Sequence, residues 1–219
     1  MAYNGHKRPK LANGRAPLTW NKDLGVWTWN IPAWDTCPGR SSFCKAECYA
    51  RKGNFTFPTV VDALQTRWDS TQDLSSFADL MVDAILWESR KGHTRFRIHS
   101  AGDFFSVDYL RTWIDIARRV KEIAPDVVLW TYTRTWRIPM FRAVLLGEAE
   151  GSPLVVWWST DPTTGVHPDA PRSAFIHAGE RYSENMPEPN CPKQAKQGDC
   201  STCGLCPDAK RDAVTFLKH

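Results

Sequence analysis

The sequence has no long apolar segment. None of its 219 residues lies in an apolar run of about 18 residues, the length needed to cross a membrane, so no membrane partner is expected. The N-terminus also lacks the apolar core of a signal peptide, which predicts a cytoplasmic protein in a reducing compartment where disulfides are uncommon. The seven cysteines are an odd number, which argues further against a complete disulfide framework.

Several catalytic motifs are absent as well. The chain contains no Gly-x-x-x-x-Gly-Lys phosphate loop, no Gly-x-Gly-x-x-Gly after a predicted strand and no Gly-x-Ser-x-Gly elbow. Nucleotide binding through the first two motifs and serine hydrolysis through the third are therefore unsupported. No internal repeat or low-complexity tract is present either, so we expect a single domain over residues 1–219.

What the chain does contain is an ordinary globular composition with an uneven charge. Hydrophobic residues make up 42% and charged residues 24%, which suits one folded domain. The net charge is +4, but residues 1–15 carry several basic side chains and no acid. Residues 1–20 are therefore either a frayed, solvated end or a basic arm that binds nucleic-acid phosphates. The rest divides into a body, 21–180, and a tail, 181–219.

The body alternates between predicted strands and helices. Apolar or alternating segments predict strands at 24–31, 94–100, 127–133, 154–159 and 172–177. Helical spacing, together with start and stop signals, predicts helices at 43–52, 58–71, 76–92, 107–123 and 139–146, with a last short one from Pro207. The third of these helices begins at a capping box formed by Ser76 and Asp79.

This alternation predicts βαβ units and therefore a parallel sheet. Near-continuous apolar strands such as 127–133 fit burial on both faces of that sheet. The preferred fold class is α/β with a compact or partial (β/α) TIM-barrel-like body, followed by a cysteine-rich C-terminal segment that a metal orders. A doubly wound open sheet is the alternative.

Three cysteines lie in the segment 35–50, DTCPGRSSFCKAECYA, directly after the first predicted strand. Cys37, Cys44 and Cys48 have x6 and x3 spacings that match no common zinc pattern. The predicted helix places Cys44 and Cys48 on one face. Because loops at the carboxyl ends of strands carry the sites of α/β folds, we interpret the three thiols as ligands of a cluster with one open iron.

The other four cysteines lie in the tail, which is polar and rich in turn residues. They read Cys191-x8-Cys200-x2-Cys203-x2-Cys206, followed by a proline, a spacing typical of iron–sulfur proteins. We predict a [4Fe-4S] cluster, with a four-thiolate zinc site as the rival. The tail has too few apolar residues to pack by itself, so metal binding would supply its folding energy.

The seven thiols leave the number of metal sites open. They supply either a four-cysteine cluster and a three-cysteine cluster, or one cluster shared between the loop and the tail. In the first arrangement the eighth ligand is His99, water or substrate.

Polar side chains also follow three of the predicted strands at their carboxyl ends, where catalysis occurs in such folds. The candidates for catalysis or ligand binding are His99, Asp103, Arg134 and Asp161. Asp103 and Arg134 could pair with each other or bind a polar ligand. His99 could be a ligand, an acid–base group or a core histidine with satisfied hydrogen bonds. Facing a thiol-rich loop, the four residues together favour a site at this mouth.

Four ordered motifs resemble those of the gene product 88-like phage proteins. They are TCPGRSSFCKAECYARKG, RIHSAGDFFSVDYLRTWIDIA, WTYTRTWR and CSTCGLC, and the resemblance runs from about residue 21 to residue 207. It implies a phage-encoded, cysteine-ligated iron–sulfur protein in the host cytoplasm. It supplies no reaction, so whether the protein is an enzyme stays open.

The Cys-x-x-x-Cys-Tyr-Ala element also resembles part of the cluster loop of radical S-adenosylmethionine enzymes. In that signature a third cysteine follows the second by three residues. This chain has Arg51 there, and its third thiol, Cys37, lies upstream, which argues against S-adenosylmethionine binding. Three functions follow: an iron–sulfur protein whose cluster is structural, redox-active or catalytic, a radical-type iron–sulfur enzyme, and a zinc-stabilised module that binds nucleic acid.

Overall fold

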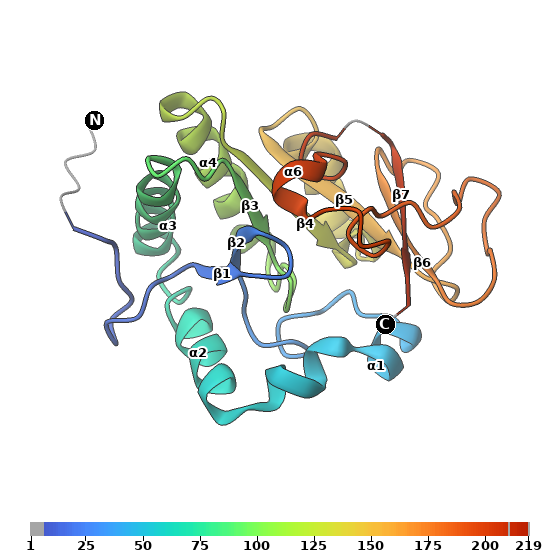
Figure 1. Cartoon of the computed structure of the whole chain (residues 1–219), viewed down its shortest axis with the longest axis horizontal. Helices are drawn as coiled ribbons and strands as arrows, with labels where there is room; N and C mark the ends of the chain where they lie inside the picture. The colour runs from blue at the N-terminus through green and yellow to red at the C-terminus, as the bar shows by residue number, and fades with distance from the viewer. Residues whose placement is uncertain (1–6, 210, 219) are drawn as a thin grey trace.

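The computed structural model describes residues 7–209 and 211–218 as an α/β fold. A seven-stranded sheet forms its centre, with the strands in the order of the sequence (Figure 1). The strands are β1 (Thr19–Asn21), β2 (Val26–Trp29), β3 (Arg95–Ile98), β4 (Val128–Thr133), β5 (Leu154–Thr160), β6 (Ser173–His177) and β7 (Ala213–Leu217). β1 and β2 are antiparallel, and all later neighbours are parallel.

The strand order has no reversal. A doubly wound sheet reverses its order at a switch point, whereas here each strand lies beside the next one in sequence. The doubly wound alternative is therefore wrong, and the predicted α/β fold with a mostly parallel sheet is confirmed. β1 and β7 are the two edges, and within the described ranges no ladder of hydrogen bonds joins them.

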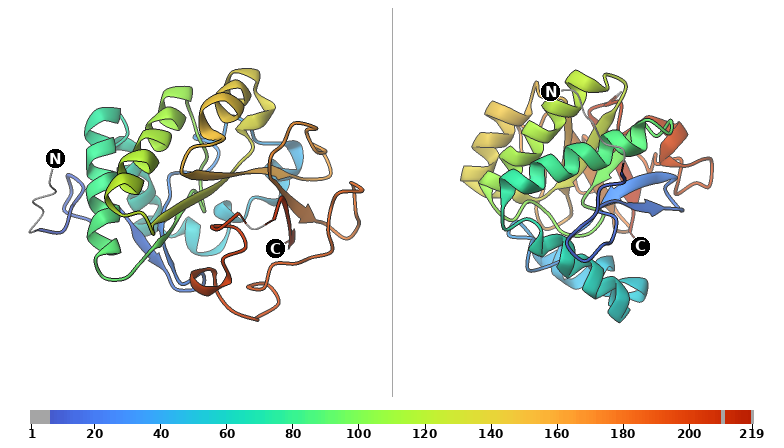
Figure 2. Two further views of the ribbon diagram at one scale, coloured as in Figure 1. Left: turned by 90° about the horizontal axis from the view of Figure 1, so that it is seen from above. Right: turned by 90° about the vertical axis from the view of Figure 1, so that its left-hand side faces the viewer.

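Helices cover one face of the sheet. They are α3 (Leu74–Ser89), α4 (Val107–Ile123) and α5 (Pro139–Val144), which continues as a π-helical turn, η4 (Leu145–Ala149). Figure 2 shows these helices on one side of the sheet and the tail on the other. The main core lies between the helices and the sheet, and its largest fully buried side chains include Trp29, Phe77, Phe96, Tyr109, Trp113 and Trp158.

Two predicted features near element ends are wrong. Asp73 immediately precedes α3, and its carboxylate accepts hydrogen bonds from the Ser75 and Ser76 amides, so Asp73 takes the capping role predicted for Ser76. The helix predicted from Pro207 is absent from the described part of the tail, where residues 213–217 form β7. A five-residue apolar segment has too little periodicity to distinguish helix from strand, and its backbone pairs with β6.

The connection between β2 and β3 begins at the carboxyl end of β2. Its first part consists of α1 (Ser42–Glu47), two 3-10 turns, η1 (Tyr49–Arg51) and η2 (Gly53–Thr56), and α2 (Pro58–Asp69), and α3 completes it. Figure 1 shows α1 and α2 beneath the sheet. α2 confirms the predicted helix, whereas α1 is shorter than predicted and ends before Cys48.

The tail covers the face of the sheet opposite the helices. Trp157, Ala174 and Val214, from three neighbouring strands, form a second, smaller core there. Leu205 and Cys206 of the tail pack against this core. The tail therefore contributes apolar contacts to the body in addition to its thiols.

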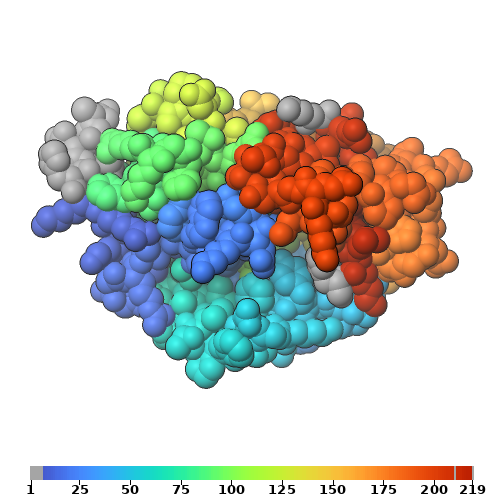
Figure 3. Space-filling view, viewed as in Figure 1, coloured from blue at the N-terminus to red at the C-terminus, as the bar shows by residue number. Residues whose placement is uncertain are grey.

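The tail also contacts the β1–β2 hairpin, and Figure 3 shows the two side by side on the surface. The tail contains one short helix in its described part, α6 (Cys200–Cys203), whose first amide donates to the Leu24 carbonyl at 2.9 Å. Gly25 has a φ of +66°, and a Cβ there would lie 2.6 Å from Oδ2 of Asp199. The hairpin turn therefore requires glycine to let the tail approach.

The described part of the basic arm packs against the body. Arg8 pairs with the buried carboxylate of Glu88 at 3.4 Å, and Arg15 pairs with Asp62 at 2.6 Å. A frayed end is therefore wrong for this part of the arm, and residues 1–6 lie outside the described residues. None of the helices in the described chain is both long and apolar enough to cross a membrane.

Candidate metal centre

The N-terminal thiol group, Cys37, Cys44 and Cys48, lies where the chain leaves β2. Cys37 precedes α1, Cys44 belongs to α1, and Cys48 follows its last residue with extended backbone angles (φ −64°, ψ 107°). A single helix carrying both later thiols, as predicted, is therefore wrong. The start of α1 is set by Ser41, whose hydroxyl accepts a hydrogen bond from the Cys44 amide at 2.9 Å.

Gly39 fixes the thiol loop to the turn after β4. A Cβ at this position would collide with the backbone carbonyl of Arg134. Nη1 of Arg137 donates to the Gly39 carbonyl at 2.9 Å. The glycine of the Pro-Gly pair therefore serves a close approach between two backbone segments.

Asp161 ties the same loop to the end of β5. Its Oδ2 accepts from the Ser41 hydroxyl at 2.6 Å and from Nε of Arg134 at 3.1 Å, and its Oδ1 accepts from Thr163. The Asp161 side chain is 0% exposed. Burial alone would raise the pKa of Asp161, but the Ser41 and Thr163 hydrogen bonds and the Arg134 charge lower it below its usual value. Asp161 is therefore an ionised carboxylate that holds the thiol loop in place through hydrogen bonds.

Asp103 occupies a neighbouring buried position after β3. Its Oδ1 accepts from the Thr133 hydroxyl at 2.6 Å and from the Phe104 amide at 2.8 Å. Its Oδ2 accepts from the Arg134 amide at 2.9 Å, so the two predicted partners meet through the backbone while the guanidinium binds Asp161. Burial raises the pKa of Asp103 to about 6 in spite of these hydrogen bonds.

His99 lies in the helix-covered core, where its contacts are with aromatic side chains. Its ring contacts Phe104, Tyr109 and Trp113 at centroid distances of 5.0, 5.7 and 6.3 Å, and Nε2 is 3.0 Å from the Tyr109 hydroxyl. A backbone φ of +59° turns the residue out of the strand pattern. Burial lowers the pKa of His99 to about 3, so the ring is neutral near pH 7. This is the environment of a core histidine.

Burial makes the Cys37 and Cys44 thiols hard to ionise. It raises the pKa of Cys37 to about 12, and Asp103 and the other two thiols of the group add to the rise. Burial also raises the pKa of Cys44, and the nearby Arg134 guanidinium partly offsets it. Thiolates form at such a site when a metal supplies the positive charge.

The tail thiol group, Cys191, Cys200, Cys203 and Cys206, lies against the sheet face opposite the helices. All four cysteines are half-buried and free of disulfides. Burial raises the pKa of Cys200 to about 11 and of Cys206 to about 12, and tail thiols add to both rises. The Tyr132 hydroxyl forms a hydrogen bond with the Cys206 sulfur, which lowers the pKa of that thiol.

Two arginines of β3 face the tail. Arg95 donates to the Ser201 carbonyl and pairs with Asp208 at 3.0 Å. The guanidinium carbon of Arg97 lies 5.0 Å from the ring centroid of Tyr132, and its Nε is buried without a hydrogen-bond partner. Leaving a buried donor unpaired costs about 1–3 kcal/mol, more for a charged group.

The two thiol groups are separate. The strongest charged neighbours of Cys37 and Cys44 are other N-terminal thiols and mouth residues, whereas those of Cys200 and Cys206 are other tail thiols and Arg97. Across the described ranges, no three His, Cys, Asp or Glu side chains are placed to hold one metal ion. One cluster shared between loop and tail therefore has no support in this arrangement.

Comparison with known proteins extends the resemblance carried by the four motifs. A family model described as Gene product 88 matches residues 4–209. The chain belongs to the Gene product 88 family. Two relatives, the Gene 88 proteins of Mycobacterium phages D29 and L5, are each 26% identical to it over 205 and 204 residues, covering 82% of this chain and 81% of each relative. No solved structure matches.

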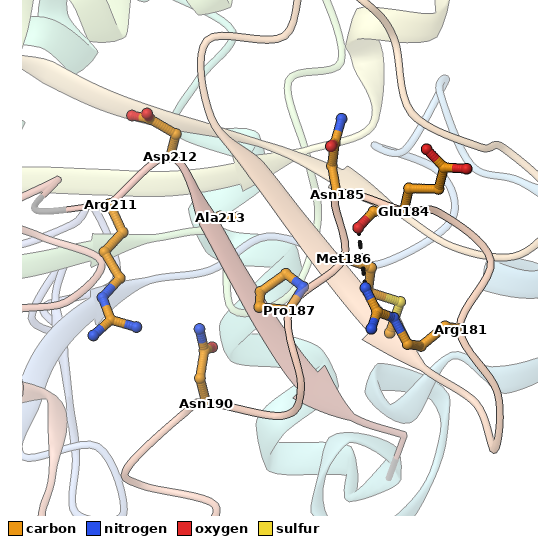
Figure 4. A pocket seen from close by; sticks show the side chains of 9 residues that line it. All are labelled: Arg181, Glu184, Asn185, Met186, Pro187, Asn190, Arg211, Asp212 and Ala213. Carbon is orange, nitrogen blue, oxygen red and sulfur yellow. Dashed lines mark hydrogen bonds between the residues drawn. The ribbon is translucent and has the colours of Figure 1, made fainter.

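Two surface hollows of this Gene product 88 family member lie at the amino ends of β6 and β7. Figure 4 shows the first, of about 350 Å³, in which Arg181 Nη2 donates to the Glu184 carbonyl at 3.0 Å. The second, of about 500 Å³, is lined by residues that include His167, Phe175 and Tyr182. The lining residues include no cysteine, so neither hollow coincides with a thiol group.

Sequence reasoning missed four side chains around the thiols: Ser41, Tyr49, Arg97 and Tyr132. Arg97 had a usable signal, because alternation along TRFRIHS places both arginines on one face of a strand predicted to be covered on both faces. Such a pair indicates an anionic partner on that face. Ser41 and Tyr49 gave no comparable signal, because their partners are distant in sequence.

Proposed function

We propose that this phage family member is an iron–sulfur protein whose tail thiol group holds a [4Fe-4S] cluster. The cluster would lie against the inner face of a partial, barrel-like sheet, which is the face opposite the helices. The arrangement of charge and sulfur carries this proposal. Four half-buried thiols act on one another electrostatically, and beside them lies a guanidinium whose Nε is buried and unpartnered. The site therefore offers four sulfur ligands and a positive charge in one place.

The cysteine spacing supports a cluster over zinc, because Cys200, Cys203 and Cys206 follow one another at x2 spacings and a proline comes next. A structural zinc ion needs all four sulfurs at about 2.3 Å from one point. In a [4Fe-4S] cluster each cysteine binds a different iron, so the sulfurs stand farther apart. Within the described residues no three potential ligands converge on a single-ion site, although the tail thiols are close enough to shift one another's pKa.

The N-terminal thiol group fits a second, three-thiol cluster at the mouth. Three cysteines leave one iron without a protein thiolate, where a substrate or water could bind. The Arg134 side chain beside Cys44 is 16% exposed, so this end of the site reaches solvent. Asp103 and Asp161 are engaged by hydrogen bonds within the protein, so their role here is to position the loop.

When bound, a tail cluster supplies one-electron transfer. The residues of the chain hold and shield the site for this chemistry. Nε1 of Trp157 donates to the Cys206 carbonyl at 3.0 Å and fixes the end of the ligand segment, while Leu205 covers the inner core. Tyr132 hydrogen-bonds the Cys206 sulfur directly.

The test is to purify the chain without oxygen and to count iron, sulfide and zinc. Two clusters predict about eight iron and eight sulfide per chain. Cys203→Ser should remove about half of the iron, and Cys44→Ser should remove the other half. Ser201→Ala, in the same short helix as Cys203, is the matched control and should keep all of it. A colourless chain with zinc and no iron contradicts the proposal.

The nucleic-acid alternative gains no support from the described part of the arm. Arg8 and Arg15 are already paired with Glu88 and Asp62, so their charges are partly neutralised within the protein. A nucleic-acid partner would show itself as binding that weakens steeply with salt and that is lost on removal of residues 1–15.

A further inference from the structure

Arg97 lies on the inner face of the sheet, the face that the tail covers. On β3, Phe96 and Ile98 point into the helix-covered core, so the alternation of the strand directs Arg97 to the tail side. Its register neighbour on β4 is Trp130, and Tyr132 lies one step further along the same face. The guanidinium is thus placed between the sheet and the tail.

The surroundings of Arg97 contain sulfur and aromatic rings but no paired carboxylate. The Tyr132 ring centroid is 5.0 Å from its guanidinium carbon, and Cys200 and Cys206 are among the groups that interact with its charge. In the described chain Arg97 forms no ion pair, whereas Arg95 on the same strand face is paired with Asp208 at 3.0 Å. The charge of Arg97 is therefore available to the thiols.

We propose that Arg97 is the half-buried counter-charge of the tail cluster and sets its reduction potential. This inference rests on the proposed function of the tail thiol group. Four thiolates around a cubane leave a net negative charge, which a nearby guanidinium stabilises. Reduction adds one further electron, so a fixed positive charge favours the reduced state and raises the potential.

Partial burial of the Arg97 side chain gives the arrangement a physical reason. Removing a charged group from water is unfavourable unless an anion or a hydrogen-bond partner compensates for it. The buried Nε of Arg97 also has no hydrogen-bond partner, which is a further unfavourable contribution. A negatively charged cluster would compensate for the partly buried charge and for the unpaired donor, so cluster binding and the position of Arg97 support each other.

Tyr132 should also raise the reduction potential of the tail cluster. Its hydroxyl forms a hydrogen bond with the Cys206 sulfur, and hydrogen bonds to cluster sulfurs are one of the factors that set iron–sulfur potentials. Tyr49 interacts electrostatically both with Arg97 and with the N-terminal thiol group.

The experiment is a potentiometric titration of the anaerobic, iron-loaded chain, with dithionite as reductant and ferricyanide as oxidant. Arg97→Met should lower the potential of the tail cluster by at least a tenfold change in the reduction equilibrium, which is 59 mV for one electron. Arg97→Lys should restore most of the shift because it keeps the charge. The matched control removes the neighbouring ion pair, Arg95→Met with Asp208→Asn, and keeps the net charge, so its shift should be smaller.

Several outcomes would overturn the inference. An unchanged reduction potential in Arg97→Met, with the iron content intact, would show that the Arg97 charge does not influence the cluster. The proposed function of the tail thiol group would still stand. If Arg97→Met fails to load iron, the Arg97→Lys variant decides: full loading supports a charge role, and equal loss in both variants contradicts it. A wild-type chain without iron and sulfide removes the proposed function and this inference together.

Discussion

The N-terminal and tail thiol groups are held in different ways. The N-terminal group sits on a loop that is fastened by hydrogen bonds to two strand ends, through Ser41, Asp161 and Arg137. The tail group sits on a polar segment with one four-residue helix in its described part. Its links to the body include a small apolar core, the Arg95–Asp208 pair and single hydrogen bonds to Leu24 and Trp157.

This difference indicates which of the two thiol groups depends on a bound metal for its ordered structure. The mouth loop is positioned by buried polar contacts that do not involve its thiols, so we expect the three thiols to be preorganised. The tail has few apolar contacts of its own, so a bound cluster should supply much of its folding free energy. Metal binding and folding are therefore expected to be coupled at the tail and largely uncoupled at the mouth.

Loss of the tail metal should have the largest effect. Cys203→Ser or chelation should expose residues 181–211 to proteases while the body stays resistant, because structural metals contribute on the order of 10 kcal/mol to such segments. Limited proteolysis with mass spectrometry measures this. Cys48→Ser is the comparison variant and should leave the tail protected. Equal protection of the tail with and without metal would remove the proposed difference between the two groups.

Gly39→Ala tests the fastening of the mouth loop. The added Cβ meets the Arg134 carbonyl, so one backbone segment must move. The free energy of unfolding should fall by about 2–3 kcal/mol, the cost of overpacking, and iron at the N-terminal group should fall with it. Gly147→Ala is the matched control, since a Cβ there meets nothing within 4 Å, and its unfolding free energy in urea should change little. Equal effects would contradict the close approach.

Asp161→Asn should weaken the loop by a somewhat smaller amount. The variant keeps the size but loses the charge that holds Arg134 and Ser41, at a cost of about 2 kcal/mol in unfolding free energy. Because the pKa of Asp161 is lowered in the fold, its contribution is present above about pH 4 and is lost as the pH falls further. Asp115→Asn, at an exposed pair with Arg119, is the control and should cost less than about 1 kcal/mol.

His99→Asn has its informative effect on the pH dependence of stability, and it separates the core from the mouth. The folded pKa of His99, about 3, lies below the ordinary value, so the unfolded chain binds more protons between these values. Wild-type stability should therefore be full above about pH 6.5 and fall by about 1.4 kcal/mol per pH unit below it. Asparagine tolerates the positive φ and should flatten that slope in urea titrations at pH 5 and pH 7. Equal slopes would contradict a buried neutral His99.

Local patterns accounted for much of the fold. α4 was predicted from 107 to 123 because its apolar residues recur at helical spacing, and the buried Trp113 and Ile114 show that face packed against the sheet. The two short edge strands of the sheet are harder to predict from the sequence. β1 and β7 were missed because three to five residues carry too little periodicity, and pairing with a neighbouring strand decided their state.

The candidate site was predicted as a set of residues but not as an arrangement. The mouth residues Asp103, Arg134 and Asp161 do meet at the carboxyl ends of the strands, as the parallel sheet implied. Their hydrogen-bond partners could not be predicted. Ser41 and Asp161, for example, are 120 residues apart in sequence and meet through the register of the sheet.

The sequence by itself determined the α/β alternation, the two cysteine spacings and the strand ends at which polar residues gather, because each depends on neighbours within a few residues. The tertiary structure decided that the thiols form two groups, that His99 turns into the core and that Arg97 faces the tail. These features depend on strand register and on which segment covers which face of the sheet. Both are set by packing between residues far apart in the chain.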